Sequence, residues 1–179
     1  MYGCVPQGVF KGQIPAPADG QDRPFMWAGC KYSKKGLIYM SRIAVVYWSG
    51  TGNTKAMADA VAEGAKSSGA EVSVFEASGF NAQQVGDFDG IAFGCPAMGD
   101  EVLEESEFDP MFTDIEKVLS GKKTALFGSY GWGDGQWMRD WEERCRAAGA
   151  ELVSDSVISN DAPGDEETEK CRELGATLA

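Results

Sequence analysis

The sequence contains no histidine, and its five cysteines show no C-x-x-C spacing. These absences remove the commonest general base and argue against a zinc site or a disulfide scaffold. No apolar run is long enough to span a bilayer, and no apolar segment follows a basic start as in a secretory signal peptide. We therefore expect a cytoplasmic protein that has reduced cysteines, no membrane anchor and no bound metal.

Basic residues are scarce relative to acidic ones. The chain has 16 lysines and arginines against 28 aspartates and glutamates, which gives a net charge of −12. A surface this negative repels nucleic acid and anionic membranes, and it suits docking to basic protein partners. The 179 residues and the 43% hydrophobic content allow one domain with a sizeable core.

Residues 1–39 differ from the rest of the chain. They are basic and rich in glycine and proline, and they show neither a helical nor a strand period. We interpret them as a disordered or loosely attached extension of a domain at 40–179. One hypothesis makes Met40 the native start, because Lys34-Lys35-Gly36 can be encoded by a purine-rich run resembling a ribosome-binding site. The alternative is a genuine accessory segment that uses its two cysteines.

Beyond residue 39, short apolar strands alternate with amphipathic helices. The expected strands are 43–48, 70–76, 90–94, 124–128 and an uninterrupted fifth strand at 151–157, with a loop or short helix at 79–84. The expected apolar helix faces carry Met57, Ala60, Val61 and Ala65; Met111, Phe112, Ile115, Val118 and Leu119; Trp137, Met138, Trp141, Cys145 and Ala148; and Cys171, Leu174 and Leu178. This alternation predicts a doubly wound α/β fold, in which helices cover both faces of a five-stranded parallel sheet.

The most informative stretch is Ser49-Gly50-Thr51-Gly52-Asn53-Thr54, which joins the first strand to a helix. Backbone N–H groups at a helix N-terminus lack intrahelical partners and lie at the positive end of the helix dipole. The two glycines allow the backbone to approach a ligand closely, and the hydroxyls can donate hydrogen bonds. The stretch predicts an anion site, with phosphate as the expected anion. An ordinary N-capped turn is the alternative.

Two further loops of unusual composition follow the third and fourth strands. They read Cys95-Pro96-Ala97-Met98-Gly99-Asp100-Glu101 and Ser129-Tyr130-Gly131-Trp132-Gly133-Asp134-Gly135. A planar ring inserted between Met98 and Trp132 would gain sulfur and stacking contacts. Because ligands of doubly wound sheets bind beyond the carboxyl ends of the strands, we expect all three loops to meet at one site.

Together these three loops resemble those of the flavodoxins, in particular the short-chain type of clostridia and related anaerobes. The resemblance covers essentially all of 40–179, including the acidic segment 101–109. It implies the strand order 2-1-3-4-5 and a noncovalently bound FMN. It also implies that the protein is a monomeric, low-potential one-electron carrier and not an enzyme, with its flavin shuttling between semiquinone and hydroquinone.

The resemblance further assigns roles to individual residues. In the family, the first loop holds the FMN phosphate, and the isoalloxazine lies between the positions matching Met98 and Trp132. The position matching Glu101 accepts a hydrogen bond from flavin N3–H, backbone donors around Gly131 reach the pyrimidine edge, and Asn160 falls in the last loop of the site. The expected cofactor-binding residues are Ser49, Gly50, Thr51, Gly52, Asn53, Thr54, Pro96, Ala97, Met98, Gly99, Asp100, Glu101, Ser129, Tyr130, Gly131, Trp132, Gly133 and Asn160.

The resemblance also implies how the potentials are set. In the family, the peptide matching Gly99-Asp100 flips on one-electron reduction, and its carbonyl accepts a hydrogen bond from flavin N5–H that stabilises the neutral semiquinone. Glycine tolerates the positive φ that such a flip needs. Surrounding carboxylates disfavour the anionic hydroquinone, which predicts a low final potential.

Partners and rival functions follow from the same loops. We expect redox proteins with basic docking patches to bind the acidic residues Asp100, Glu101, Glu104, Glu105 and Glu107. Candidates by resemblance are ferredoxin- or flavodoxin-dependent oxidoreductases such as the pyruvate enzyme, hydrogenase and nitrogenase. The main alternative is a flavin-dependent NAD(P)H:quinone reductase, although Met98 and Trp132 would block the ring faces that its substrates need. A regulatory flavoprotein for ribonucleotide reductase is a further alternative, whereas a phosphate-binding P-loop would require a lysine after Gly52.

Overall fold

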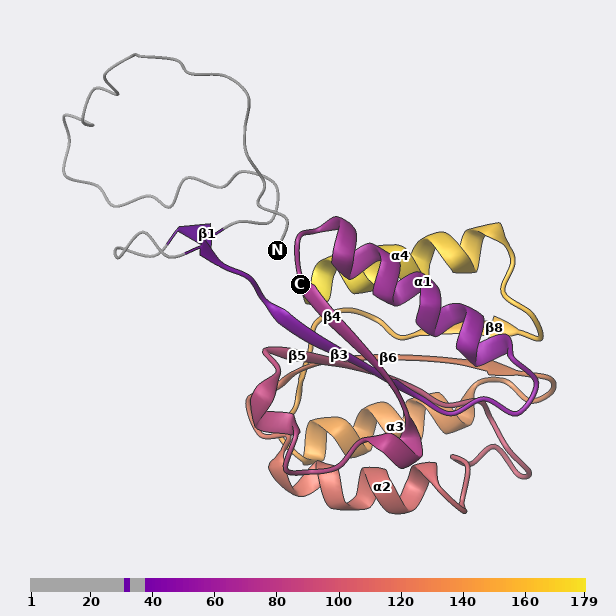
Figure 1. Cartoon of the computed structure of the whole chain (residues 1–179). Coiled ribbons are helices and arrows are strands. Elements are labelled where there is room, and N and C mark those ends of the chain that lie inside the picture. Colours follow the sequence, from indigo (N-terminus) through magenta and orange to yellow (C-terminus); the bar gives the residue numbers. More distant parts are fainter. Residues whose placement is uncertain (1–30, 33–37) are drawn as a thin grey trace, which may run out of the picture.

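The computed structural model describes residues 31–32 and 38–179 of the chain. The strands are β1 (Lys31–Tyr32), β2 (Ile38–Tyr39), β3 (Arg42–Tyr47), β4 (Glu71–Glu76), β5 (Gly90–Gly94), β6 (Lys123–Tyr130), β7 (Glu151–Leu152) and β8 (Val157–Asn160). The α-helices are α1 (Asn53–Ser67), α2 (Phe108–Ile115), α3 (Gln136–Ala147) and α4 (Asp165–Leu178), and the short 3₁₀ helices are η1 (Ala77–Gly79), η2 (Val85–Asp87) and η3 (Glu116–Val118). Figure 1 shows that these elements form three layers, with α1 and α4 on one face of the central sheet and α2 and α3 on the other.

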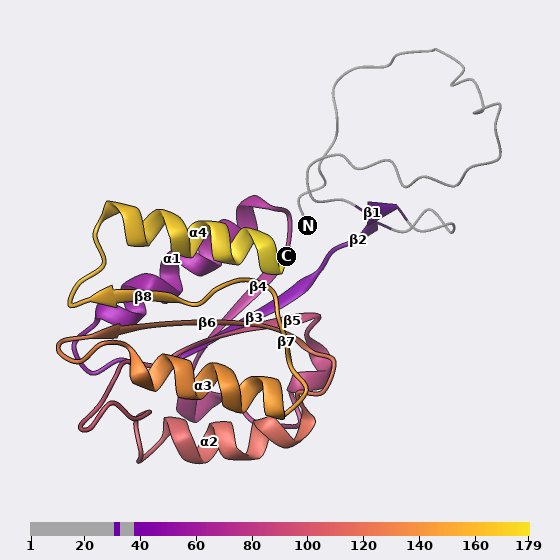
Figure 2. The same cartoon turned by 180° about the vertical axis from the view of Figure 1, so that it is seen from behind.

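The central sheet is parallel, and its order is β4-β3-β5-β6, followed by β7 and β8, which both pair with β6. This is the order 2-1-3-4-5 that the resemblance implied, so the predicted topology is confirmed. Because the strands are parallel, the segments that leave β3, β5 and β6 all emerge at the same edge of the sheet. The view from behind in Figure 2 shows α2 and α3 side by side on their face of the sheet.

Alternation along β3 explains why the sheet has a core on each face. Ile43 and Val45 pack into a buried cluster with residues of α1 and α4, whereas Ala44 and Val46 pack into a cluster with residues of α2 and α3. Neighbouring side chains on a strand point to opposite faces, so one continuously apolar strand serves both layers. The apolar runs that predicted the strands therefore reflect burial on two sides.

The fifth position of the sheet differs from the predicted uninterrupted strand at 151–157. Leu152 of β7 pairs with Thr124, and Val157 of β8 pairs with Phe127, so the interval between the two pairs holds two more residues on this strand than on β6. The interval is polar, and Ser156 Oγ donates a hydrogen bond of 2.6 Å to Glu142 of α3. The prediction of an unbroken strand was wrong: β7 ends at Leu152 and β8 begins at Val157, and Ser156 between them bonds to α3 instead of the sheet.

The helix expected at 111–119 also differs in detail. The α-helical part ends at Ile115, and η3 continues the chain to Val118. Phe112, Ile115 and Leu119 are buried as predicted, but Val118 is 46% exposed. A 3₁₀ turn has three residues per turn instead of 3.6, so it rotates later positions away from the face that the helical period predicts.

The described residues of the amino-terminal segment form one short antiparallel pair, in which β1 pairs with β2. The rest of 1–39 lies outside the described residues, so the interpretation of this segment as an extension, and of Met40 as the native start, stays a prediction. Among the helices in the described part of the chain, none is both long and apolar enough to cross a membrane.

Candidate functional site

The three loops singled out in the sequence meet at the carboxyl edge of the sheet. A cleft of about 250 Å³ opens between them. It is lined by Trp48, Gly50, Thr51, Asn53, Pro96, Ala97, Met98, Ser129, Tyr130, Gly131 and Asp161. All of these except Trp48 and Asp161 were expected from the sequence to contact a cofactor, so half of the predicted set lines the cleft.

The N-terminus of α1 opens toward this cleft. Gly52 is the N-cap, with a left-handed φ of 95°, and its carbonyl accepts the N–H of Ala56 at 3.0 Å. Ser49 Oγ accepts the N–H of Gly52 at 3.0 Å, so this hydroxyl shapes the turn. The N-cap supplies no side-chain cap to the first turn, and the first turn carries no acidic residue. The first N–H groups of α1 thus remain available to an anion in the cleft.

Thr54 lies beneath this loop instead of lining the cleft. It is 1% exposed, and its hydroxyl lies 3.1 Å from the hydroxyl of Ser129, which does line the cleft. Ser129 and Tyr130 themselves belong to β6 and not to the following loop, which therefore begins at Gly131. The hydroxyl pair ties the start of α1 to the end of β6 and fixes the direction of the Ser129 side chain.

A tight hairpin carries the next predicted residues. The N–H and carbonyl of Met98 bond to the carbonyl and N–H of Val102 at 2.8 and 3.0 Å, which leaves residues 99–101 at the tip. Gly99 has a φ of 43°, and a Cβ built there would meet no atom within 4 Å. The tip of the hairpin is therefore free of packing around this peptide.

Glu101 closes the hairpin against α3. Its backbone has a φ of 56°, and its Oε1 accepts the N–H groups of Gly135 and Gln136, both at 2.9 Å. The same carboxylate occupies the space beside Gly133, where a Cβ would lie 2.4 Å from it. Glu101 thus caps the N-terminus of α3 and links the second loop of the site to the third.

Glu104 does not lie on the acidic surface predicted for partner docking. It is 5% exposed, and its carboxylate accepts hydrogen bonds from the hydroxyl and N–H of Ser106 and from the N–H groups of Glu107 and Phe108. Burial opposes ionisation, but these donors outweigh it and lower the pKa of Glu104 to about 2. The docking role proposed for Glu104 was therefore wrong: this carboxylate caps the N-terminus of α2.

The two residues expected to flank a ring are placed differently. Met98 lines the cleft and is 37% exposed, whereas Trp132 is 60% exposed and lies outside the lining. Of the two side chains expected to cover the ring faces, only Met98 therefore lines the cleft. The cleft lining also includes Trp48, an aromatic residue directly before the first loop that was not among the expected cofactor contacts.

Asn160 does not lie in a loop. It ends β8, where it pairs with Tyr130. The next residue, Asp161, lines the cleft with a left-handed φ of 58°, and its N–H donates to the Tyr130 carbonyl at 2.7 Å. The sequence indicated Asp161 only weakly, because its place in the site depends on the exact residue at which β8 ends.

These residues fit FMN. The uncapped N-terminus of α1 suits a phosphate, the hydroxyls of Thr51 and Ser129 face the same cleft, and Trp48, Met98 and Tyr130 supply apolar contact surface. No lysine or arginine lines the cleft among the described residues, so hydrogen bonds and the helix terminus would have to neutralise the phosphate.

Comparison with known proteins agrees with this site. The family model described as Flavodoxin matches residues 45–175. The flavodoxin of Clostridium beijerinckii is 50% identical over 135 residues, covering 75% of this chain and 97% of that protein. The flavodoxin of Megasphaera elsdenii is 44% identical over 137 residues, covering 76% of this chain and 98% of that protein.

A solved structure extends the likeness to the fold. The solution structure of two-electron reduced Megasphaera elsdenii flavodoxin superimposes with a TM-score of 0.71 at 45% identity, covering 76% of this chain and 97% of that one. The short-chain resemblance is thus confirmed over the same part of the chain that carries the cleft. The chain belongs to the flavodoxin family, whose members are FMN-binding electron carriers and not enzymes.

Proposed function

We propose that this chain is a monomeric, cytoplasmic, low-potential one-electron carrier that binds FMN in the cleft described above, with the phosphate at the N-terminus of α1. When bound, FMN supplies the capacity to take up and release electrons singly. The observation that supports this placement most directly is the uncapped first turn of α1, which opens to the cleft beside Thr51 and Asn53.

The residues around the phosphate would divide into contacts and supports. Gly50, Thr51 and Asn53 line the cleft and can donate from the backbone or side chain. Ser129 can donate its hydroxyl proton to the same anion, while the buried Thr54 hydroxyl holds it in position. Ser49 keeps the turn closed through the Gly52 N–H and acts on the phosphate indirectly.

At the ring end, we assign Met98 to one face of the flavin ring and Trp132 to the outer face. Trp132 is 60% exposed, so its side chain is accessible to a ligand or partner. Glu101 uses Oε1 for the N-terminus of α3. An ionised carboxylate has about four acceptor positions, so its second oxygen remains an acceptor for a ring N–H. One side chain would then fix the hairpin, α3 and the cofactor together.

The carboxylates near the cleft favour a low potential. Asp161 lines the cleft, and Asp100 and Glu101 lie at the tip of the adjoining hairpin. Adding negative charge to a partly dry site with these neighbours costs electrostatic energy, which lowers the potential at which the last electron enters. The open space around Gly99 leaves room for its peptide to change orientation during this change of charge.

Electron carriers of this family serve redox partners, and for this chain we propose partners with basic docking patches. Such partners include ferredoxin- or flavodoxin-dependent oxidoreductases, hydrogenase and nitrogenase. The net charge of −12 supports fast, salt-sensitive encounters with a basic surface. The quinone-reductase alternative is not favoured, because the relatives that cover the whole domain are electron carriers.

The test of this function is a stepwise anaerobic dithionite titration of the FMN-loaded protein, followed by visible absorbance. We expect a long-wavelength band that rises during the first half of the titration and then falls, as two separated one-electron steps require. Direct bleaching without such a band would contradict the proposal and would favour a hydride-handling reductase. Addition of NAD(P)H and a quinone would then be the next measurement.

A further inference from the structure

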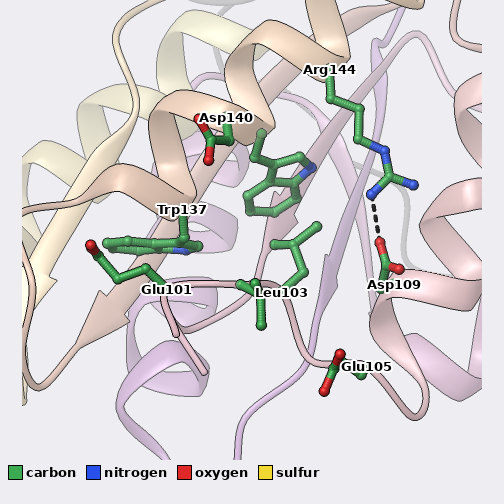
Figure 3. Close-up of a pocket in the computed structure, with 9 residues that line it drawn as sticks. Glu101, Leu103, Glu105, Asp109, Trp137, Asp140 and Arg144 are labelled. Carbon is green, nitrogen blue, oxygen red and sulfur yellow. Dashed lines mark hydrogen bonds and ion pairs between the residues drawn. The ribbon is translucent and has the colours of Figure 1, made fainter. Parts of the chain in front are cut away.

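Trp137, in the first turn of α3, lies behind the cofactor cleft and does not line it. The side chain is 2% exposed and packs in the buried cluster that α2 and α3 form with the sheet. Figure 3 shows it beside Glu101 and Leu103 of the hairpin segment, with which it lines a separate pocket. Any influence of Trp137 on a ligand in the cleft must therefore pass through its neighbours.

The Trp137 indole supplies a hydrogen bond at the point where the hairpin leaves the sheet. β5 pairs with β6 as far as Gly94 and Phe127, and the next residue, Cys95, begins the segment that leads to the hairpin. The Cys95 carbonyl accepts Trp137 Nε1–H at 3.3 Å. A Cβ built on Gly128 would overlap the same carbonyl oxygen, so this peptide lies close against β6. Because a buried carbonyl needs a donor, the indole fixes the direction of this peptide.

The Cys95 thiol extends this support to the far side of the hairpin. Its sulfur, although a weak acceptor, receives the Glu104 N–H at 3.3 Å. In the part of the chain that the structure describes, no backbone hydrogen bond joins 95–97 to 103–104, so the thiol provides this connection. Trp137 thus holds a residue that connects both sides of the hairpin.

The ring of Trp137 supports a second wall of the cleft. Its centroid lies 5.4 Å from that of the Tyr130 ring, and the two ring planes are tilted by 46°. Tyr130 ends β6 and lines the cleft. Aromatic rings at this separation attract each other, so the indole restrains the Tyr130 ring from behind. One buried side chain therefore contacts two of the three segments that surround the cleft.

Trp141, one turn later on α3, provides an internal comparison. It is 1% exposed, and its ring packs edge-on against Phe108 and Phe112 of α2. Its Nε1–H has no hydrogen-bond partner among the described residues. Both indoles fill the same core, but of the two only that of Trp137 is bonded to a segment of the cleft. The pair therefore allows packing to be separated from positioning.

We propose that Trp137 is a positioning residue of the flavin cleft. Its indole N–H fixes the start of the hairpin, whose first side carries Pro96, Ala97 and Met98, and its ring supports Tyr130. The inference rests on the proposed binding of FMN in this cleft and adds a residue that acts on the ring site without contacting it. Within the described residues, neither its hydrogen bond nor its ring contact reaches the phosphate loop, so the effect is expected at the ring.

The test compares Trp137→Phe with the matched control Trp141→Phe in the full chain. Both substitutions reduce a buried indole of α3 to a phenyl ring, but of the two only Trp137→Phe removes a hydrogen bond. The measurements are the dissociation constants of FMN and of riboflavin, obtained by fluorescence titration of the apoprotein. Riboflavin carries the same ring without the phosphate, so the two ligands together locate the effect.

We expect Trp137→Phe to bind FMN and riboflavin more weakly by the same factor, roughly five- to tenfold, as the loss of one hydrogen bond predicts. The ligand must then order a hairpin that the indole no longer holds. Trp141→Phe should leave both constants close to those of the wild type. Equal weakening in the two variants would assign the effect to packing and overturn the inference. Unchanged constants in Trp137→Phe, or a loss for FMN alone, would overturn it as well.

Hydrogen exchange of the apoprotein supplies a readout that does not depend on the cofactor. The Ala97 and Glu104 amides bond to the Ser129 carbonyl and to the Cys95 sulfur. Relative to the amides of α4, we expect them to exchange roughly tenfold faster in Trp137→Phe than in Trp141→Phe, because the hairpin opens more often. Equal relative rates in the two variants would contradict a role of the indole in holding the hairpin.

The indole ¹H–¹⁵N signals of the unmodified protein decide the question if Trp137→Phe fails to fold. We expect the Trp137 signal to move when FMN binds, whereas the Trp141 signal stays in place. A Trp137 signal that ignores FMN would overturn the inference alone. If the wild-type protein failed to bind FMN at all, the proposed function would fail, and the inference with it.

Discussion

The helices differ in which group accepts hydrogen bonds from the free N–H groups at their N-termini. At α2 and α3 the chain supplies its own carboxylate, Glu104 in one case and Glu101 in the other. At α4, Glu167 accepts the Gly164 N–H and the first turn is acidic. At α1 only the neutral hydroxyl of Ser49 is engaged, and the first turn carries no acidic residue.

The same interaction therefore stabilises the fold at three helices, and at α1 we propose that it binds a ligand. Unsatisfied N–H groups and the helix dipole attract an anion in every case. Where the anion is a side chain, the helix end is closed and contributes to stability. Where the chain supplies no carboxylate, as at α1, the helix end faces the cleft in which we propose that the phosphate binds. Substitutions that add or remove a carboxylate at one of these helix ends test this difference.

The largest effect is expected from closing the open end with Asn53→Asp. A carboxylate at this cleft-lining position would repel a phosphate about 4 Å away by about 4 kcal/mol at an effective dielectric of 20, so FMN affinity should fall roughly a thousandfold. The apoprotein should become slightly more stable, because an acidic residue suits the first turn of a helix. Fluorescence titration with FMN measures the first effect and thermal unfolding the second.

Two controls locate the effect in the phosphate site. Riboflavin, which lacks the phosphate, should bind the wild type and Asn53→Asp with similar affinity. Gln136→Glu adds the same charge at the N-terminus of α3, which Glu101 already closes, and should change FMN affinity far less. A loss of riboflavin affinity equal to the loss for FMN would mean that the substitution disturbs the fold of the cleft instead.

The next largest effect is expected from Glu104→Gln, which neutralises a buried cap. Its folded-state pKa of about 2 lies below the ordinary glutamate value of 4.5, so ionisation stabilises the folded state. By linkage this contributes about 3 kcal/mol to the free energy of unfolding above pH 4.5, and the contribution is lost as pH falls from 4.5 toward 2. Urea unfolding at neutral pH should show the corresponding loss in the variant.

The pH dependence separates this role from simple packing. Between pH 4.5 and 2 the wild type should lose more stability than Glu104→Gln, so that their difference shrinks toward acid. Glu107→Gln, an exposed neighbour that makes no side-chain cap, serves as the matched control and should behave as the wild type. A constant difference between wild type and Glu104→Gln across this range would rule out the carboxylate as the cause.

A smaller effect is expected from Glu101→Ala, which opens the N-terminus of α3. Loss of this cap should lower the free energy of unfolding of the apoprotein by about 1 kcal/mol, because the carboxylate is only half-buried. FMN affinity should fall as well, since the same side chain joins the hairpin to the third loop. An unchanged melting temperature would show that solvent replaces the cap without cost.

The smallest change in stability is expected from Gly99→Ala. The added Cβ meets no atom, so the cost is limited to the positive φ, about 1 kcal/mol. FMN should still bind, but the amplitude of the long-wavelength band in a dithionite titration should fall. The same amplitude in the variant and the wild type would argue against a reorientation of this peptide.

The sequence predicted the features that depend on local pattern. Apolar strands, helical spacing and the composition of the first loop indicated the sheet and the open end of α1. The sequence could not distinguish Glu104 from Glu105, because both belong to one acidic run. Glu104 is buried only because its carboxylate folds back onto the N-terminus of α2. The break between β7 and β8 and the position of Asp161 likewise depend on pairing with β6, although the polar run at 154–156 was a usable sign.

The most direct test of the account is an NMR titration that follows backbone amides at the open and the closed helix ends. With FMN, the amide signals of residues 53–55 should move strongly downfield, as expected for N–H groups that donate to a phosphate, and with riboflavin they should move little. The amides of Gly135 and Gln136, already bound by Glu101, should show no such difference between the two ligands. Equal shifts with FMN and riboflavin at 53–55, or a phosphate-dependent shift at 135–136 instead, would contradict the assignment of the phosphate to the N-terminus of α1.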